Sequence, residues 1–215
     1  MTRILGWLAA AGLVAGLVMA FAVAPREATQ GNVQRIMYVH VPAVLVAYLA
    51  FGVVFAGSIA YLWKRAEGAD RLARACAEVG LLFLGVSIAT GSIWGKPTWG
   101  TWWTWDARIT SVTIVFVIFL GYLLLRGMTE DPERGARYAA VLGILGALNI
   151  PLVHQSVNWW RTLHQPASML KAGGITMPAS ILVPVLVNVA AFALLCAYFV
   201  VKRVRLLEAE REALA

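Results

Sequence analysis

Tryptophan and histidine are the residues of this chain whose types and spacing could do chemistry. The 215 residues include nine tryptophans, and five of these lie in or beside one short segment: Trp94, Trp99, Trp102, Trp103 and Trp105. If this segment were helical, the spacing i, i+3, i+4 and i+7 would place four side chains on one face: Trp99, Trp102, Trp103 and Asp106. Such a face would form a flat aromatic shelf edged by a carboxylate, on which a large planar apolar ligand could stack. The alternative is an interfacial anchoring helix, in which Asp106 only caps the helix that follows.

The three histidines of the chain, His40, His154 and His164, fall in or near the same set of loops. Two neutral imidazoles beside an aromatic surface meet the requirement for bis-histidine ligation of haem iron. Five basic residues in these loops could pair with the haem propionates: Arg35, Lys96, Arg108, Arg161 and Lys171. An aromatic cage for a quaternary ammonium would also use the tryptophans, but it would leave the histidines without a role.

Several other functions are disfavoured by what the chain lacks. Cys76 and Cys196 have neither CxxC nor metal-ligand spacing, so they predict no disulfide and no zinc site. No GxxxxGK(S/T) string is present to bind ATP phosphates. The basic residues flank apolar runs and are shared among several loops, which indicates membrane anchoring and no nucleic-acid partner. The apolar runs contain no interior Asp, Glu, Lys or Arg, which disfavours an ion-coupled transporter.

Membrane-spanning elements must position these residues, because the composition is not that of a soluble chain. Hydrophobic residues make up 60% and charged residues only 13%, against about 25% charged in an ordinary globular domain. Backbone groups in lipid must be satisfied internally, so the long uncharged runs predict helices and not the alternating strands of a barrel. The sequence therefore predicts an all-α integral membrane protein, a single domain over residues 1–215 with six transmembrane helices at about 4–25, 38–63, 78–95, 108–126, 138–156 and 176–201.

The first of these runs also resembles a secretory signal. Ala22-Val23-Ala24 is similar to a signal-peptidase site, but the apolar run from Ile4 to Pro25 is uninterrupted and exceeds the roughly 7 to 15 residues of a secretory apolar region. We expect this segment to be retained as the first span.

Lysine and arginine counts predict the orientation. With the N terminus inside, the inner segments hold twelve: Arg3, Lys64, Arg65, Arg71, Arg74, Arg126, Arg134, Arg137, Lys202, Arg203, Arg205 and Arg211. The outer segments hold six: Arg26, Arg35, Lys96, Arg108, Arg161 and Lys171. An excess of Lys and Arg marks the cytoplasmic side, so both termini are predicted to be cytoplasmic. The Trp-rich segment, residues 95–108, would then lie on the outer side between the third and fourth spans, with Pro97 ending the third span or starting a turn.

The run WGKPTWGTWWTWDAR, from Trp94 to Arg108, resembles the tryptophan-rich "WWD" signature of haem-handling proteins of cytochrome c biogenesis. It is most similar to the family of cytochrome c maturation protein C, also called haem exporter protein C, whose members have six spans and about this length. Further matching segments are 35–42, 149–151 and 157–165. The resemblance extends from about Gln30 to the last span.

The resemblance implies roles for individual residues. His40 and His164 would be the axial iron ligands of haem b, bound as cargo, and His154 would be structural. The remaining haem-binding residues would be Trp94, Trp99, Trp102, Trp103, Trp105, Asp106 and Arg108.

The resemblance also implies a function and partners. The protein would be a multi-pass subunit of the bacterial inner membrane with its functional loops in the periplasm. It would act with ABC-transporter subunits and a small single-span accessory subunit to present haem to a periplasmic haem chaperone, and would not itself be an enzyme. One alternative is a haem lyase that attaches haem directly to an apocytochrome, although related lyases are generally longer. Another is an electron-transfer cytochrome b, which would normally place its ligands within the bundle and need no Trp-rich segment.

The placement of the histidines suggests where haem is acquired. All three lie toward the predicted outer side, and the inner halves of the spans offer no His or Met pair as a relay. We therefore expect haem to be captured at the outer leaflet or through a lateral cleft, and not to be pumped through this subunit.

Overall fold

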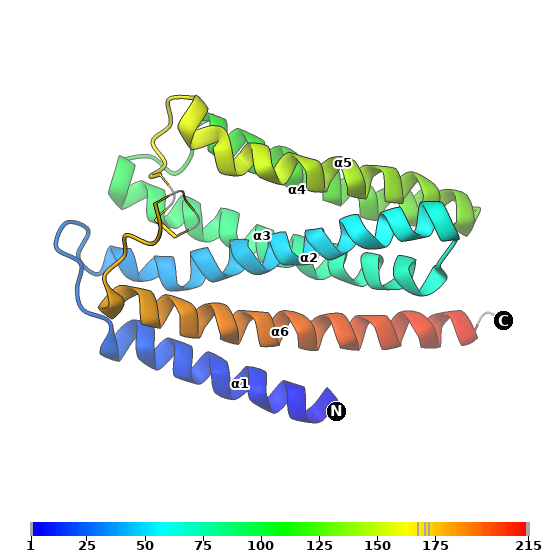
Figure 1. Cartoon of the computed structure of the whole chain (residues 1–215), viewed down its shortest axis with the longest axis horizontal. Helices are drawn as coiled ribbons and strands as arrows, with labels where there is room; N and C mark the ends of the chain where they lie inside the picture. The colour runs from blue at the N-terminus through cyan, green and yellow to red at the C-terminus, as the bar shows by residue number, and fades with distance from the viewer. Residues whose placement is uncertain (1, 167, 170, 172, 214–215) are drawn as a thin grey trace.

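A computed structural model describes residues 2–166, 168–169, 171 and 173–213 of this chain as helices joined by loops (Figure 1). Six long helices are present in the described residues: α1 (Thr2–Val18), α2 (Met37–Lys64), α3 (Glu67–Trp99), α4 (Ala107–Met128), α5 (Pro132–Trp159) and α6 (Ala179–Glu212). A π-helical turn, η1 (Met19–Val23), extends α1, and a 3-10 turn, η2 (Val33–Ile36), leads into α2. All six helices are long and apolar enough to span a membrane. The predicted all-α membrane fold with six spans is confirmed.

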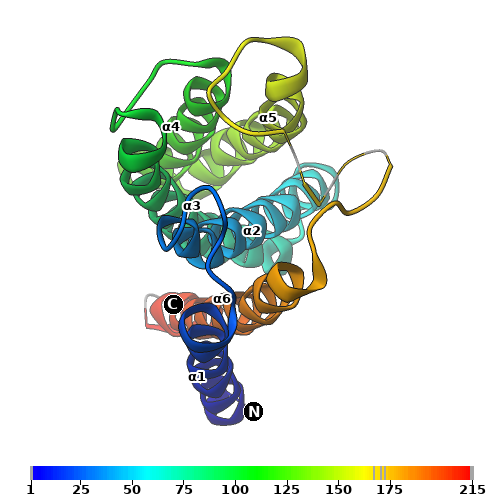
Figure 2. The same cartoon turned by 90° about the vertical axis from the view of Figure 1, so that its left-hand side faces the viewer.

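The helices pack as three antiparallel pairs, α1 with α6, α2 with α3, and α4 with α5. The α2–α3 pair lies between the other two (Figure 2). Both termini lie at one end of the bundle, and the loops 24–36, 100–106 and 160–178 lie at the other (Figure 1). We call these the terminal end and the loop end.

Small residues and stacked rings bring the pairs together. A Cβ at Gly57 of α2 would lie 2.9 Å from the carbonyl oxygen of Ala69 on α3, so glycine permits the close approach of these helices. Phe51 of α2 stacks on Phe119 of α4 with ring centroids 3.7 Å apart, and both rings are fully buried. These contacts form a continuous apolar core between the α2–α3 and α4–α5 pairs.

A single amide joins the first helix to the last. Asn188 of α6 is buried and donates a hydrogen bond from Nδ2 to the carbonyl of Gly16 on α1, at 3.0 Å. A Cβ at position 16 would lie 2.5 Å from the Asn188 amide oxygen, so the contact requires glycine. Interhelical hydrogen bonds of this kind hold helices together in lipid, where apolar burial provides little drive for association.

The third helix differs from its predicted span at both ends. It begins at Glu67 and not near residue 78, because charge marks where a helix leaves the membrane and does not mark where the helix ends. It also continues through Pro97 to Trp99, so the expectation that Pro97 ends this span is wrong. Pro97 costs α3 one hydrogen bond, because its nitrogen cannot donate to the Ile93 carbonyl, and the helix ends three residues later, where Gly100 adopts a left-handed conformation with φ of 80°.

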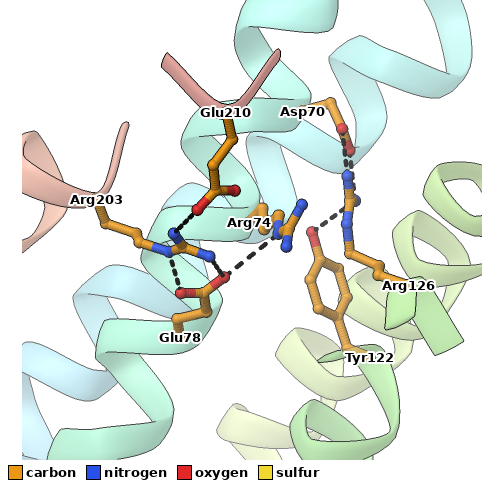
Figure 3. Close-up of polar contacts among 7 residues, drawn as sticks. All are labelled: Asp70, Arg74, Glu78, Tyr122, Arg126, Arg203 and Glu210. Atoms are coloured by element: carbon orange, nitrogen blue, oxygen red, sulfur yellow. Dashed lines mark hydrogen bonds and ion pairs between the residues drawn. The ribbon is translucent and has the colours of Figure 1, made fainter. Parts of the chain in front are cut away.

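Ion pairs tie the helices at the terminal end (Figure 3). Arg126 of α4 donates two hydrogen bonds to the Asp70 carboxylate of α3, at 2.7 and 2.5 Å, and a longer one to the Tyr122 hydroxyl. Both members of the pair are largely buried, with side chains 11% and 14% exposed. Glu78 of α3 accepts hydrogen bonds from Arg203 of α6, so α3 is joined to both neighbouring helices at this end.

Candidate functional site

A cavity of about 270 Å³ lies at the loop end of the bundle, lined by α2, α3, α4, α5 and the connecting loops. It brings together most of the residues singled out in the sequence: His40, Trp94, Trp99, Trp102, Trp103, Arg108, His154 and His164. Trp105 and Asp106 are absent from its lining. The three histidines come from α2, α5 and the 160–178 loop, so only the folded chain places them around one space.

His40 is held in one tautomer by the third helix. Its Nδ1 lies 2.9 Å from the carbonyl oxygen of Ser87 and 3.2 Å from the hydroxyl of Thr90. A carbonyl can only accept, so Nδ1 carries the proton and Nε2 keeps its lone pair. Gly91 makes room for the ring, since a Cβ there would lie 3.0 Å from the His40 Cε1 atom. Trp94 packs edge-on against the imidazole at a centroid distance of 5.8 Å.

His164 has the same arrangement in the loop between α5 and α6. Its Nδ1 lies 3.1 Å from the Gln165 carbonyl oxygen and donates to it, which again leaves Nε2 unprotonated. The ring lies 5.9 Å from that of Trp99, centroid to centroid. Burial and the nearby Arg108 guanidinium lower the pKa of His164, although the Gln165 carbonyl and Asp106 oppose the shift. The imidazole is therefore neutral at pH 7, the state in which it can bind iron.

The Trp-rich segment is not the helix that its spacing suggested. Trp99 is the last residue of α3, and residues 100–106 form an irregular turn that folds back over this helix. The Ser92 hydroxyl donates to the Trp102 carbonyl at 2.7 Å and fixes the turn to α3. Trp99, Trp102 and Trp103 therefore reach one cavity by reversal of the chain at Gly100 and not by helical periodicity. Trp102 remains 56% exposed at the edge of the cavity.

Asp106 joins the Trp-rich segment to the loop that carries His164. One carboxylate oxygen accepts from the Ile109 backbone N–H at 2.9 Å, so Asp106 is the N-cap of α4, the simpler role considered for it from the sequence. The other oxygen accepts from the Leu163 N–H at 3.1 Å and from the Thr162 hydroxyl. The His164 N–H in turn donates to the Thr162 hydroxyl at 3.1 Å. Asp106 therefore positions His164 from outside the cavity.

The sequence suggested five basic residues as partners for the propionates. Of these, Arg108 is the one that lines the cavity in the described part of the chain. Its Nε is buried without a hydrogen-bond partner in the described part of the chain, as is the neighbouring Trp103 Nε1. Buried donors normally find acceptors, so these two groups mark a place for a polar or anionic part of a ligand. Arg35 instead donates to backbone carbonyls at the end of η1, and Lys96 donates to the Gly100 carbonyl.

Several lining residues carry no signal in the sequence that could have identified them. Gln30 accepts a hydrogen bond from Trp94 Nε1 at 2.8 Å and ties the first loop to α3. Met169 and Met177 line the cavity from the 160–178 loop. His154, assigned a structural role by resemblance, also lines this cavity. In the described residues no three His, Cys, Asp or Glu side chains form a cluster that could hold a free metal ion.

Comparison with known proteins shows the family of this chain. A family model described as heme exporter protein C matches residues 1–215. The chain is 45% identical over 196 residues to heme exporter protein C of Bradyrhizobium diazoefficiens, covering 90% of this chain and 74% of the relative. It is 35% identical over 203 residues to the protein of the same name from Escherichia coli K12, covering 93% and 81%, and 38% identical over 196 residues to that of Paracoccus denitrificans, covering 89% and 81%. The chain therefore belongs to the heme exporter protein C family.

Proposed function

We propose that this protein holds haem at the loop end of the bundle, with His40 and His164 as the two axial ligands of the iron. One observation carries the proposal: two imidazoles from separate elements border one cavity, and each uses Nδ1 on a backbone carbonyl and keeps Nε2 for a metal. The names of the relatives, heme exporter protein C, support haem as the cargo.

The other cavity residues would hold the porphyrin. Trp99, Trp102 and Trp103 offer flat apolar surfaces for the macrocycle, and the Arg108 guanidinium is the partner for a propionate. Trp94 supports His40, and Trp105 packs on Trp103 at a centroid distance of 5.5 Å from outside the cavity. Haem b, which is attached by coordination and not covalently, fits the role of a cargo that must leave again.

The size of the cavity favours delivery over storage. Pockets that enclose a drug-sized ligand measure about 300 to 1,000 Å³, and this one measures about 270 Å³. A bound haem would therefore keep an exposed edge, next to the exposed Trp102 and Trp105. We propose that a periplasmic haem chaperone takes up haem from this edge, and that the protein acts as a delivery subunit and not as an enzyme.

The location follows from the orientation we propose, and the partners are those expected for the family. Twelve of eighteen Lys and Arg residues flank the terminal end, which indicates a cytoplasmic terminal end and a periplasmic loop end in the bacterial inner membrane. ABC-transporter subunits and a small single-span subunit would complete the complex. Haem would arrive from the outer leaflet or a lateral cleft, and haem bound near the terminal end of the helices would contradict this route.

Visible absorption of the purified protein in detergent tests the ligand pair. With haem added, we expect a low-spin bis-histidine spectrum that is lost in His40→Ala and in His164→Ala and retained in His154→Ala. Circular dichroism of each variant checks that the helices are intact. Loss of the spectrum in His154→Ala alone would move the second ligand to α5, and covalent attachment of haem to an added apocytochrome would favour the lyase alternative.

A further inference from the structure

A second hollow, a groove of about 860 Å³, lies at the terminal end of the bundle. Its walls are the first turn of α1, the middle of α3 and the last turns of α6, and it shares no residue with the cavity at the loop end. Apolar side chains form much of its surface, among them Leu82, Tyr198 and Phe199. Gly6 of α1 packs against Tyr198 of α6, and α6 continues beyond this contact to Glu212 (Figure 1).

Unpaired cations line this groove. Arg3, Lys202 and Arg205 all border it, and none of them makes an ion pair in the described ranges of the chain. Arg203 beside them differs, because Glu78 and Glu210 neutralise it (Figure 3). Glu78 is the one carboxylate in the lining, and it is fully occupied by Arg203 and Arg74. The groove therefore has three positive charges that form no ion pair with the residues that the structure describes.

The groove lies at the depth of lipid headgroups. Helix α6 has 34 residues, which at 1.5 Å per residue is about 50 Å, well beyond a hydrocarbon core of about 30 Å. Lys202 is the first charged residue after the uncharged run that follows Lys171, so the membrane boundary falls near it. Arg3 stands at the matching boundary of α1, just before the uncharged run that ends at Arg26. The hydroxyl of Thr2, which also lines the groove, is buried without a partner in the described residues.

We propose that this groove binds an anionic phospholipid. The phosphate would lie among Arg3, Lys202 and Arg205, and an acyl chain would follow Leu82, Tyr198 and Phe199 along the bundle. Basic pockets between transmembrane helices recognise anionic headgroups in this way. The bound lipid would fill the space where α1 and α6 diverge and would stabilise their contact. This site does not depend on the haem proposal.

Native mass spectrometry of the full chain in detergent tests the site with defined lipids. We expect phosphatidylglycerol to be retained and phosphatidylcholine with the same acyl chains to be lost. The double variant Lys202→Gln with Arg205→Gln should bind phosphatidylglycerol about thirtyfold more weakly, since each basic residue near an anionic surface contributes roughly fivefold. A matched control removes one lysine and one arginine elsewhere at the terminal end, Lys64→Gln with Arg134→Gln, and should bind as the parent does.

Three outcomes would overturn the proposal. Equal weakening in the two double variants would mean that overall charge attracts the lipid and that the groove does not. Displacement of the lipid by millimolar inorganic phosphate would indicate a small-anion site. Recovery of the protein with its membrane partners, with no phosphatidylglycerol retained in the assembly, would show that a partner helix covers the groove. The haem spectrum of the variants should stay unchanged, which separates this test from that of the haem site.

Discussion

The hydrogen bond that Nδ1 donates determines which nitrogen each histidine can offer to a metal. His40 depends on Ser87 and Thr90, two residues of a neighbouring helix, whereas His164 depends on the carbonyl of the next residue in its own loop. Partners of this kind fix the tautomer and the ring orientation of a ligating histidine and raise its basicity. His40 is the more rigid of the two, because its partners sit on a packed helix.

Removing the Thr90 hydroxyl should weaken haem binding without removing a ligand. In Thr90→Val the Ser87 carbonyl still accepts from His40, so we expect the affinity for haem to fall by about tenfold, the lower end of the range for such partners. Titration followed at the Soret band measures the change.

Thr113→Val is the matched control for Thr90→Val. The Thr113 hydroxyl bonds only to the Ile109 carbonyl of its own helix, at 2.8 Å, and lies outside the cavity lining. Equal affinities of the two variants would show that Thr90 does not act through His40.

The charge state of His164 should respond to two neighbours in opposite directions. Burial and Arg108 lower its pKa, and Asp106 raises it, so the imidazole should remain neutral as the pH falls through about 6.5, the ordinary value. Carbethoxylation of the haem-free protein, which requires a neutral ring, can be followed at His164 by mass spectrometry. We expect a midpoint below 6.5 that rises in Arg108→Gln and falls in Asp106→Asn. A midpoint at or above 6.5 in the parent protein would contradict the assigned environment.

At the scale of the elements, one residue both caps a helix and holds a loop in place. The N-cap residue of α4, Asp106, also holds the loop that carries His164. One of its carboxylate oxygens accepts from the Ile109 N–H in the first turn of α4, and the other accepts from the Leu163 N–H in the loop. The N-cap of α5, Asp131, accepts the capping bonds from the N–H groups of Glu133 and Arg134 and forms an exposed ion pair with the Arg134 side chain at 3.2 Å, all within the first turn of its own helix. A comparison of substitutions at Asp106 and Asp131 therefore separates the effect of losing a cap from the effect of releasing the loop.

Asp106→Ala and Asp131→Ala should both destabilise the protein but affect haem differently. Each loses an N-cap worth about 0.5 to 2 kcal/mol, which thermal unfolding can measure. Only Asp106→Ala also frees the loop that carries His164, so only this variant should release haem faster, as measured by transfer to an excess of apomyoglobin. Equal release rates would show that the loop does not depend on Asp106.

The elements were more predictable than the contacts between them. Uncharged runs indicate six helices because lipid excludes charge, but they misplace the start of α3, whose first turns are charged. The prediction that the Trp-rich segment is helical is wrong from Gly100 onward, because spacing alone does not reveal a residue with positive φ that reverses the chain. The pairing of Thr90 with His40 spans fifty positions, and no local pattern in the sequence encodes it.

At the scale of the whole molecule, the two ends of the bundle differ in how they are held. The terminal end has buried ion pairs between helices, whereas the loop end holds the cavity and is fastened by hydrogen bonds of loops. Rearrangements that admit or release haem should therefore occur at the loop end, while the helices at the terminal end stay packed against one another.

Breaking the Asp70–Arg126 pair should destabilise the bundle strongly. Asp70→Asn leaves the Arg126 guanidinium buried without a counter-charge, and such a loss costs about 3 to 5 kcal/mol. Glu133→Gln, which breaks the exposed pairs with Arg137 and Arg65, should cost less than about 1 kcal/mol. Chemical unfolding in mixed micelles gives both values, and similar costs would mean that the Asp70 site is well hydrated. The haem spectrum of folded Asp70→Asn should match that of the parent.

The hydrogen bond between Asn188 and Gly16 has a consequence for biosynthesis. A ribosome delivers α1 to the membrane first and α6 last, yet these two helices are partners. Until α6 emerges, α1 must wait in the bilayer as a lone helix, so assembly of the bundle can be completed only after translation of the final span. A chain stalled before residue 188 would leave α1 unpaired and open to membrane quality-control proteases.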